Sequence, residues 1–101
     1  MFLAMNRFRI ARGHEDAFLD HWRRRQSYLH EVPGFVSFQL LRGATAEDHT
    51  LFASHAVWES EAAFENWTQS EAFRKAHMQA AQTPREFYVG PPQLEVFESV
   101  L

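Results

Sequence analysis

The stretch VPGFVSFQLLRG, residues 32–43, carries the strongest fold signal in the chain. Its Pro33-Gly34 pair is typical of a helix end, and the residues after it indicate a strand over Phe35–Arg42. The preceding segment has apolar residues at helical spacing: Ala17, Phe18, Trp22, Leu29 and Val32. We therefore expect a helix over residues 13–32 that is followed directly by a strand.

Strand and helix signals continue on both sides of this stretch. Apolar alternation or a short apolar run predicts strands over residues 2–10, 35–42, 50–59 and 94–101. A hairpin over residues 43–49 suits the connection between the second and third strands. Ser60 and Ser70 are each followed by Glu, which favours two helix N-caps. The first of these helices would run through Trp67 and the second through about Ala81.

This order, βαββαβ with the second helix split in two, predicts one ferredoxin-like α+β domain over residues 1–101. Helices on one face leave the other face of the sheet in need of a cover. The chain is 46% hydrophobic, with ten Phe and three Trp, a large aromatic content for 101 residues. We expect a homodimer, an α+β barrel in which two sheets pack face to face. Residues such as Phe38 or Phe52 are expected on that open face.

Composition excludes several classes of function. The formal net charge of −3 argues against nucleic acid as a partner. The absence of cysteine excludes a disulfide scaffold, a thiol nucleophile and an iron–sulfur cluster. The start, MFLAMNRFRI, has neither the pattern of a signal peptide nor the length of a membrane span. A cytoplasmic protein without a membrane partner is expected.

His77, in SEAFRKAHMQAA, has surroundings that differ from those of the other five histidines. Phe73 precedes it by one helical turn, and Ala76, Ala80 and Ala81 lie on or near the same face. An aromatic ring, an imidazole and small residues can line a slot for a flat molecule, and a neutral imidazole there can ligate haem iron. The alternative is a histidine at the edge of the core that is hydrogen-bonded to a carbonyl. No two histidines have the i, i+4 spacing of a helical metal site.

Asn6 and Trp67 are the other unusual positions. Alternation places Asn6 on the apolar face of the first strand, where its amide needs the backbone, water or a ligand as partner. Trp67 precedes His77 by ten residues, and a helix break at Ser70 allows both side chains to line one pocket. Ordinary core packing explains Trp67 equally well, so neither residue decides the function alone.

Together, these residues resemble a known catalytic triad. Asn6, Trp67 in AFENWTQSEAF and His77 in FRKAH are similar to the Asn–Trp–His triad of the IsdG-type haem-degrading monooxygenases, within the antibiotic biosynthesis monooxygenase superfamily. The resemblance spans nearly the whole chain. The patterns VPGF…FQLL and VWES…AF…W mark the superfamily fold, whereas the triad is more specific. Within the group, the chain resembles the proteobacterial haem-utilisation branch most.

The resemblance implies a homodimer with one haem bound in each subunit. His77 would be the axial ligand of the haem iron, and Asn6 would donate its amide to oxygen bound on the distal side. Trp67 would press on the porphyrin and hold it out of plane. Haem would be cofactor and substrate together, consumed with O₂ and electrons from an unidentified reductase. The products would be iron and an open, bilin-type tetrapyrrole.

Two positions of the first helix also match the family's haem pocket. Trp22 occupies a place more often held by Phe, and Arg25 a place where an Arg can face the haem. Phe73, from its place beside His77, is read as a wall of the slot. Core packing for Trp22 and a solvated face for Arg25 are the alternatives. The run Arg23–Arg25 offers a partner for a haem propionate, although exposed charge runs are common.

Two other functions remain compatible with the sequence. One is a cofactor-independent quinol monooxygenase of the same superfamily, in which a phenolic substrate reacts with O₂ without a metal. The other is a dimeric protein that binds haem without being an enzyme.

Overall fold

A computed structural model describes residues 1–25 and 27–101. The elements follow the order β1 (Phe2–Ala11), α1 (Glu15–Arg24), η1 (Leu29–Glu31), β2 (Phe35–Thr45), β3 (His49–Trp58), α2 (Glu61–Thr68), α3 (Glu71–Ala80), η2 (Arg85–Phe87) and β4 (Gln93–Glu98). None of the described helices is long and apolar enough to cross a membrane.

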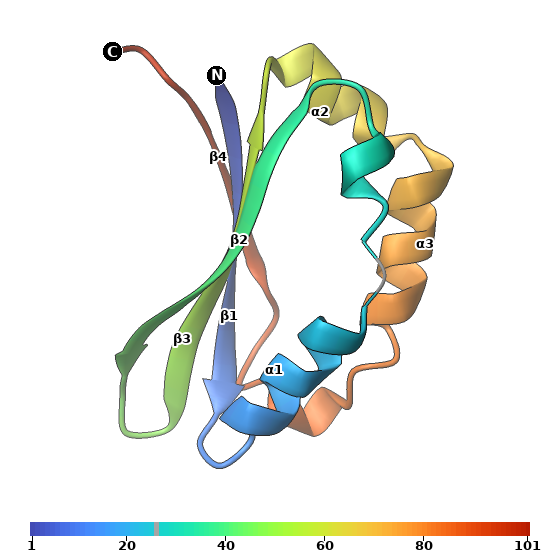
Figure 1. The fold of residues 1–101 in the computed structure, drawn as a ribbon. Coiled ribbons are helices and arrows are strands. Elements are labelled where there is room, and N and C mark those ends of the chain that lie inside the picture. Colours follow the sequence, from blue (N-terminus) through green and yellow to red (C-terminus); the bar gives the residue numbers. More distant parts are fainter. Residues whose placement is uncertain (26) are drawn as a thin grey trace.

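The four strands form one antiparallel sheet in the order β2-β3-β1-β4. The helices all lie on one side of this sheet, and both termini lie at the same end of it (Figure 1). The expected ferredoxin-like α+β fold is thereby confirmed, including the split of the second helix into α2 and α3.

Both predicted N-caps are present. The Oγ of Ser60 accepts a hydrogen bond from the Ala63 N–H at 3.1 Å, and the Oγ of Ser70 accepts one from the Phe73 N–H at 3.2 Å. These bonds satisfy backbone donors that a helix start leaves without a partner. They fix where α2 and α3 begin.

The first helix is shorter than the sequence predicts. Instead of residues 13–32, α1 covers Glu15–Arg24, and Arg25 has extended backbone angles. A separate 3₁₀ turn follows at Leu29–Glu31, where the Ser27 hydroxyl accepts a hydrogen bond from the Leu29 N–H at 3.3 Å. Gln26, which the predicted helix included, lies outside the described residues. The prediction failed here because the segment contains no Gly or Pro to mark the break.

The core lies between the sheet and α1. Its fully buried members include Ile10, Phe18 and Phe52, with Phe8 and Phe87 beside them. The expectation for Phe52 was therefore wrong, because Phe52 pairs with Phe8 across the strands and packs 5.2 Å from Phe18, ring centre to ring centre. The same holds for Phe38, whose ring stacks on Trp22 of α1 at 5.5 Å. Neither ring lies on the open face.

Other apolar side chains occupy the face of the sheet that is turned away from the helices. Side chains paired across antiparallel strands share a face, and the residues opposite in parity to the core include Leu3, Met5, Leu41, Leu51, Val57 and Phe97. Leu41 and Phe97 remain 39% and 47% exposed in the single chain. The same face also carries polar side chains, among them the ion pair of Arg7 with Glu95. Exposed apolar side chains with polar ones around them are typical of an interface.

Candidate functional site

The register between β1 and β3 leaves an uneven surface beneath the helices. Phe2 pairs with Trp58 at one end and Phe8 with Phe52 at the other, whereas the two pairs between them are small: Ala4 with Ala56, and Asn6 with Ser54. The aromatic pairs are buried, but Asn6, Ser54 and Ala56 are only half-buried although they lie on the two central strands. Two aromatic clusters thus flank a shallow, partly polar strip.

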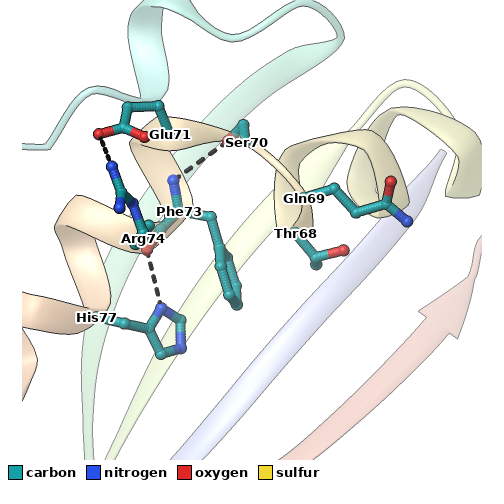
Figure 2. Close-up of a pocket in the computed structure, with 7 residues that line it drawn as sticks. All are labelled: Thr68, Gln69, Ser70, Glu71, Phe73, Arg74 and His77. Atoms are coloured by element: carbon teal, nitrogen blue, oxygen red, sulfur yellow. Dashed lines mark hydrogen bonds and ion pairs between the residues drawn. The ribbon is translucent and has the colours of Figure 1, made fainter.

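Trp67, Phe73 and His77 are brought together above one end of this strip. The Trp67 and Phe73 rings meet edge to face with their centres 4.8 Å apart, and the centres of the Phe73 and His77 rings are 3.9 Å apart. Phe73 and His77 point to the same side of α3, whereas Arg74 turns away to pair with Glu71 (Figure 2). Trp67 also packs 5.1 Å from Trp58, which joins the group to the sheet.

His77 has one ring nitrogen engaged and one available. Its Nδ1 lies 3.1 Å from the carbonyl oxygen of Phe73, one turn earlier in α3. A proton on Nδ1 donated to that carbonyl leaves Nε2 as the unprotonated, metal-binding nitrogen. The carbonyl hydrogen bond considered from sequence is thus present, and it fixes the orientation of the ring.

The junction of α2 and α3 is hollowed by a surface pocket of about 470 Å³. Its wall contains Phe73 and His77, and the polar residues Thr68, Gln69, Ser70, Glu71 and Arg74 complete it (Figure 2). Asn6, Trp22 and Arg25 do not line this pocket. The predicted site residues therefore fall into a group on α2 and α3, a group at the C-terminal end of α1, and Asn6 on β1.

Trp22 and Arg25 form the second group. The Arg25 guanidinium lies over the Trp22 ring, 4.0 Å from its centre, and its Nη2 donates a 3.4 Å hydrogen bond to the Thr83 hydroxyl. Burial lowers the pKa of Arg25, and nearby Tyr88 opposes this shift. Arg25 is thus a partly desolvated cation rather than a solvated one. Arg23, in contrast, is exposed and pairs with Asp20 at 2.9 Å.

Several predicted site residues carry a buried polar atom without a hydrogen-bond partner. In the described part of the chain these atoms are Asn6 Oδ1, Trp22 Nε1, Arg25 Nε and Trp58 Nε1. Three of the four belong to residues singled out from the sequence. Because native proteins seldom leave such atoms unsatisfied, those of Asn6, Trp22 and Arg25 are candidates for hydrogen bonds to a bound molecule.

The third helix supports the same interpretation. Helix α3 packs chiefly against α2, and none of its residues is buried. Its apolar side carries Ala72, Phe73, Ala76 and Ala80, which are half-buried. An amphipathic helix is normally stabilised by burying this side, so α3 has apolar surface available for a ligand.

Sequence reasoning missed several residues of this region. Leu94 and Val96 of β4 pair with Asn6 and Ala4 and continue the strip to the sheet edge, where they are 60% and 47% exposed. Their alternation in LEVFE was the available signal. Thr83 and Tyr88, which lie beside Arg25, stand on either side of Pro84 in the segment after α3 and carried no sequence signal. Within residues 1–25 and 27–101, no three His, Asp or Glu side chains gather to hold a metal ion among themselves.

The fold and this arrangement define a small α+β protein with an aromatic, partly polar ligand site beneath its helices. The model of the antibiotic biosynthesis monooxygenase family matches residues 1–79, and the chain belongs to that family of monooxygenase-type enzymes.

Individual relatives point to haem within the family. The chain is 24% identical over 84 residues to a heme-degrading monooxygenase of Bacillus thuringiensis (strain Al Hakam), covering 83% of this chain and 78% of that one. It is 26% identical to the heme-degrader MhuD of Mycobacterium tuberculosis, solved with two hemes bound in its active site, with a TM-score of 0.73 over 100% of this chain and 97% of that chain.

Another solved structure shares the fold alone. SnoaB of Streptomyces nogalater, a cofactor-independent oxygenase, is 21% identical with a TM-score of 0.68, covering 99% of this chain and 93% of that chain. The same fold thus carries more than one kind of oxygenase.

Proposed function

We propose that residues 1–101 form a single-domain haem-degrading monooxygenase of the IsdG type. One observation carries the proposal: His77 has Nδ1 held by the Phe73 carbonyl and Nε2 available, beside aromatic rings and a helix face with nothing buried against it. The haem-degrading relatives support it. Assignment to the proteobacterial haem-utilisation branch is part of the same proposal.

The residues present fit a haem. The strip of small pairs, Ala4 with Ala56 and Asn6 with Ser54, is flanked by aromatic clusters and carries an unpartnered buried amide oxygen. His77 would hold the iron through Nε2, with Phe73 and Trp67 against the macrocycle. Bound haem supplies a redox-active iron and is itself the substrate, since O₂ and electrons from an external donor open its ring at a meso carbon to release iron and a bilin.

Asn6 and Trp67 would shape this reaction from two directions. An amide N–H is a neutral donor, so Asn6 would orient a bound oxygen species without itself delivering a proton. Trp67 is a rigid ring held between Trp58, Phe64 and Phe73 at 5.1, 6.0 and 4.8 Å. Because these neighbours limit its movement, it would resist a flat macrocycle and favour a distorted one.

Arg25 and Trp22 would act at the periphery. A partly desolvated guanidinium without a carboxylate partner among the contacts described attracts an anion. In the proposed complex, this anion would be a propionate group of the haem. Trp22, packed against Phe8, Phe18 and Phe38, would form the wall behind it and narrow the site relative to a Phe.

The proposal includes a homodimer and an electron donor. The apolar open face of the sheet would pack against that of a second copy, and each subunit would hold one haem. A reductase of unidentified type would supply the electrons.

Titration of the purified protein with haemin tests the proposal. We expect a sharp Soret band that saturates at one equivalent per subunit and is abolished or shifted in His77→Ala. His49→Ala is the matched control, because His49 pairs with Asp48 at the far hairpin and should leave the band unchanged. A broad spectrum typical of free haemin for the unmodified protein would contradict the proposal.

The same titration separates the two alternatives. A cofactor-independent quinol monooxygenase would give no saturable Soret band. A haem carrier would give the band but keep its haem intact when a reductant is added in air.

A further inference from the structure

We propose that Ser54 is a positioning residue that orients the Asn6 amide toward the bound ligand, a role that rests on the function proposed above. Ser54 of β3 is the direct cross-strand partner of Asn6 of β1. In such an antiparallel pair the Cβ atoms lie about 4.5–5.5 Å apart and the side chains share a face. The hydroxyl therefore emerges beside the amide, on the side of the sheet that the helices cover.

The neighbours of this pair are apolar. On this face, the residues paired across the four strands are Leu40, Ser54, Asn6 and Leu94. The neighbouring pair on the same face of β1 and β3 is Ala4 with Ala56. Ser54 is thus the hydroxyl among these residues that can serve the amide. Its small side chain also leaves open space above the sheet between the larger Phe52 and Trp58 rings.

Asn6 has an unmet requirement that Ser54 can satisfy. The Asn6 Oδ1 is buried and has no hydrogen-bond partner. A serine side chain has three staggered χ1 rotamers, and its hydroxyl proton turns to suit an acceptor. Rotation of Ser54 toward Asn6 would let the hydroxyl donate to Oδ1.

This hydrogen bond would have a directional consequence. With Oδ1 accepting from Ser54, the planar Asn6 amide has its NH₂ group turned away from β3, where it would remain available to the ligand. A donor bonded to the carbonyl end also polarises the amide, which makes its N–H a better donor. Ser54 would therefore act on the ligand through Asn6 and not by contact.

Two variants of equal shape isolate the hydroxyl. Ser54→Thr keeps it and Ser54→Val removes it, while both add the same bulk. The probe is azide, titrated into the ferric haemin-loaded protein and followed by the Soret shift, because under the proposed function the Asn6 amide would donate a hydrogen bond to azide bound by the iron. We expect Ser54→Val to bind azide roughly fivefold more weakly than Ser54→Thr, the effect of one lost hydrogen bond.

A double-mutant cycle checks that the effect passes through Asn6. In an Asn6→Ala background, Thr and Val at position 54 should bind azide equally. Ser54→Ala serves if the larger side chains prevent folding, as judged by thermal unfolding of the haem-free protein, and should weaken azide binding as Val does. In that case the comparison is between Ser54→Ala, which lacks the hydroxyl, and the unmodified Ser54, which keeps it. The same comparison is made in the Asn6→Ala background.

The outcomes distinguish this role from the function on which it rests. Equal azide affinities for the hydroxyl-bearing and hydroxyl-free variants, with an intact Soret band, would overturn the role of Ser54 and leave haem binding standing. A difference that persists in the Asn6→Ala background would overturn positioning through Asn6. Failure of the unmodified protein to bind haemin would instead overturn the proposed function.

Discussion

Single residues determine what chemistry this site supports, and His77 and Asn6 approach it from different elements. His77 is oriented by a hydrogen bond within its own helix, whereas the Asn6 Oδ1 has no partner. A histidine with a preset tautomer is ready to bind a metal. An amide oxygen without a hydrogen-bond partner leaves the orientation of its side chain to be set by a ligand or a neighbouring residue.

Trp67 should affect the rate of degradation more than the affinity for haem. We expect Trp67→Phe to slow single-turnover degradation roughly tenfold, because the smaller ring presses less on the macrocycle. Its haemin affinity should change less than about threefold, because Phe73 and His77 remain in place. Stopped-flow Soret decay and haemin titration measure the two quantities.

Trp58→Phe is the matched control for this change. Trp58 packs against Trp67 but is fully buried, so its replacement by Phe should lower thermal stability, and it should slow degradation per folded protein less than Trp67→Phe does, because Trp67 itself and its contacts with Phe64 and Phe73 remain. Equal losses of affinity and rate in Trp67→Phe would show that Trp67 only binds the haem.

Glu15 ties the start of α1 to the sheet and should make stability depend on pH. Hydrogen bonds from its own backbone N–H and from the Thr50 hydroxyl, the latter at 2.9 Å, hold the pKa of Glu15 below its usual range. Because the folded-state pKa is the lower one, Glu15 stabilises the fold above the unfolded value of about 4.3. This contribution is lost as the pH falls through the folded-state pKa.

Urea unfolding between pH 7 and pH 3 measures this dependence. Glu15→Gln should be less stable than the unmodified protein at pH 7 and should lose less stability on acidification. Asp16→Asn removes an exposed carboxylate from the same helical turn and should keep the original pH slope. Identical slopes for Glu15→Gln and the unmodified protein would refute the role of Glu15.

Among the elements, α3 depends strongly on its cap, because, like α2, it buries no residue of its own. Ser70 holds both sides of the helix break: its hydroxyl accepts from the Phe73 N–H and donates to the Trp67 carbonyl at 2.6 Å. The three residues joined here include two that we place in the site. The cap therefore sets the relation between Trp67 and His77.

Loss of this cap should weaken both the fold and the site. We expect Ser70→Ala to destabilise the protein by about 1 kcal/mol and to lower haemin affinity. Ser70→Thr keeps both hydrogen bonds and should retain stability and affinity. Thermal unfolding and haemin titration of the two variants are the measurements, and equal behaviour of Ala and Thr would show that the cap is dispensable.

The elements also show what local sequence patterns can predict. Ser60 and Ser70 marked the starts of α2 and α3 because an N-cap is a local hydrogen bond between neighbours in the chain. The end of α1 was predicted wrongly because tertiary contacts decide it: Arg25 leaves the helix and lies over Trp22, with Thr83 from a distant segment as partner. The sequence around Arg25 gives no sign of this contact, because Thr83 lies far away along the chain.

At the scale of the whole molecule, the fold leaves exposed apolar side chains on both sides of the sheet. The strip under the helices lies between aromatic clusters, and the opposite face carries Leu3, Met5, Leu51 and Val57. Alternation along β1 predicted that Asn6 shares a face with Phe8. The placement of Phe52 needed the cross-strand register, which pairs it with Phe8 and which one strand alone does not reveal.

The open face should hold the homodimer together. Val57 lies on it opposite Leu3, so Val57→Lys places a charge in the proposed interface and should convert a dimer to monomers in sedimentation velocity. Met78→Lys is the control, because Met78 is exposed on α3 on the other side of the sheet. A mass unchanged by Val57→Lys would exclude this face as the interface.

The central claim is that this chain opens the haem ring, and a single turnover tests it most directly. The haemin-loaded protein is mixed with ascorbate in air, the tetrapyrrole is analysed by mass spectrometry, and iron is captured by a ferrous chelator. We predict a linear tetrapyrrole and about one equivalent of released iron per haem, both absent in His77→Ala. Recovery of intact haem with its iron retained by the unmodified protein would contradict the account.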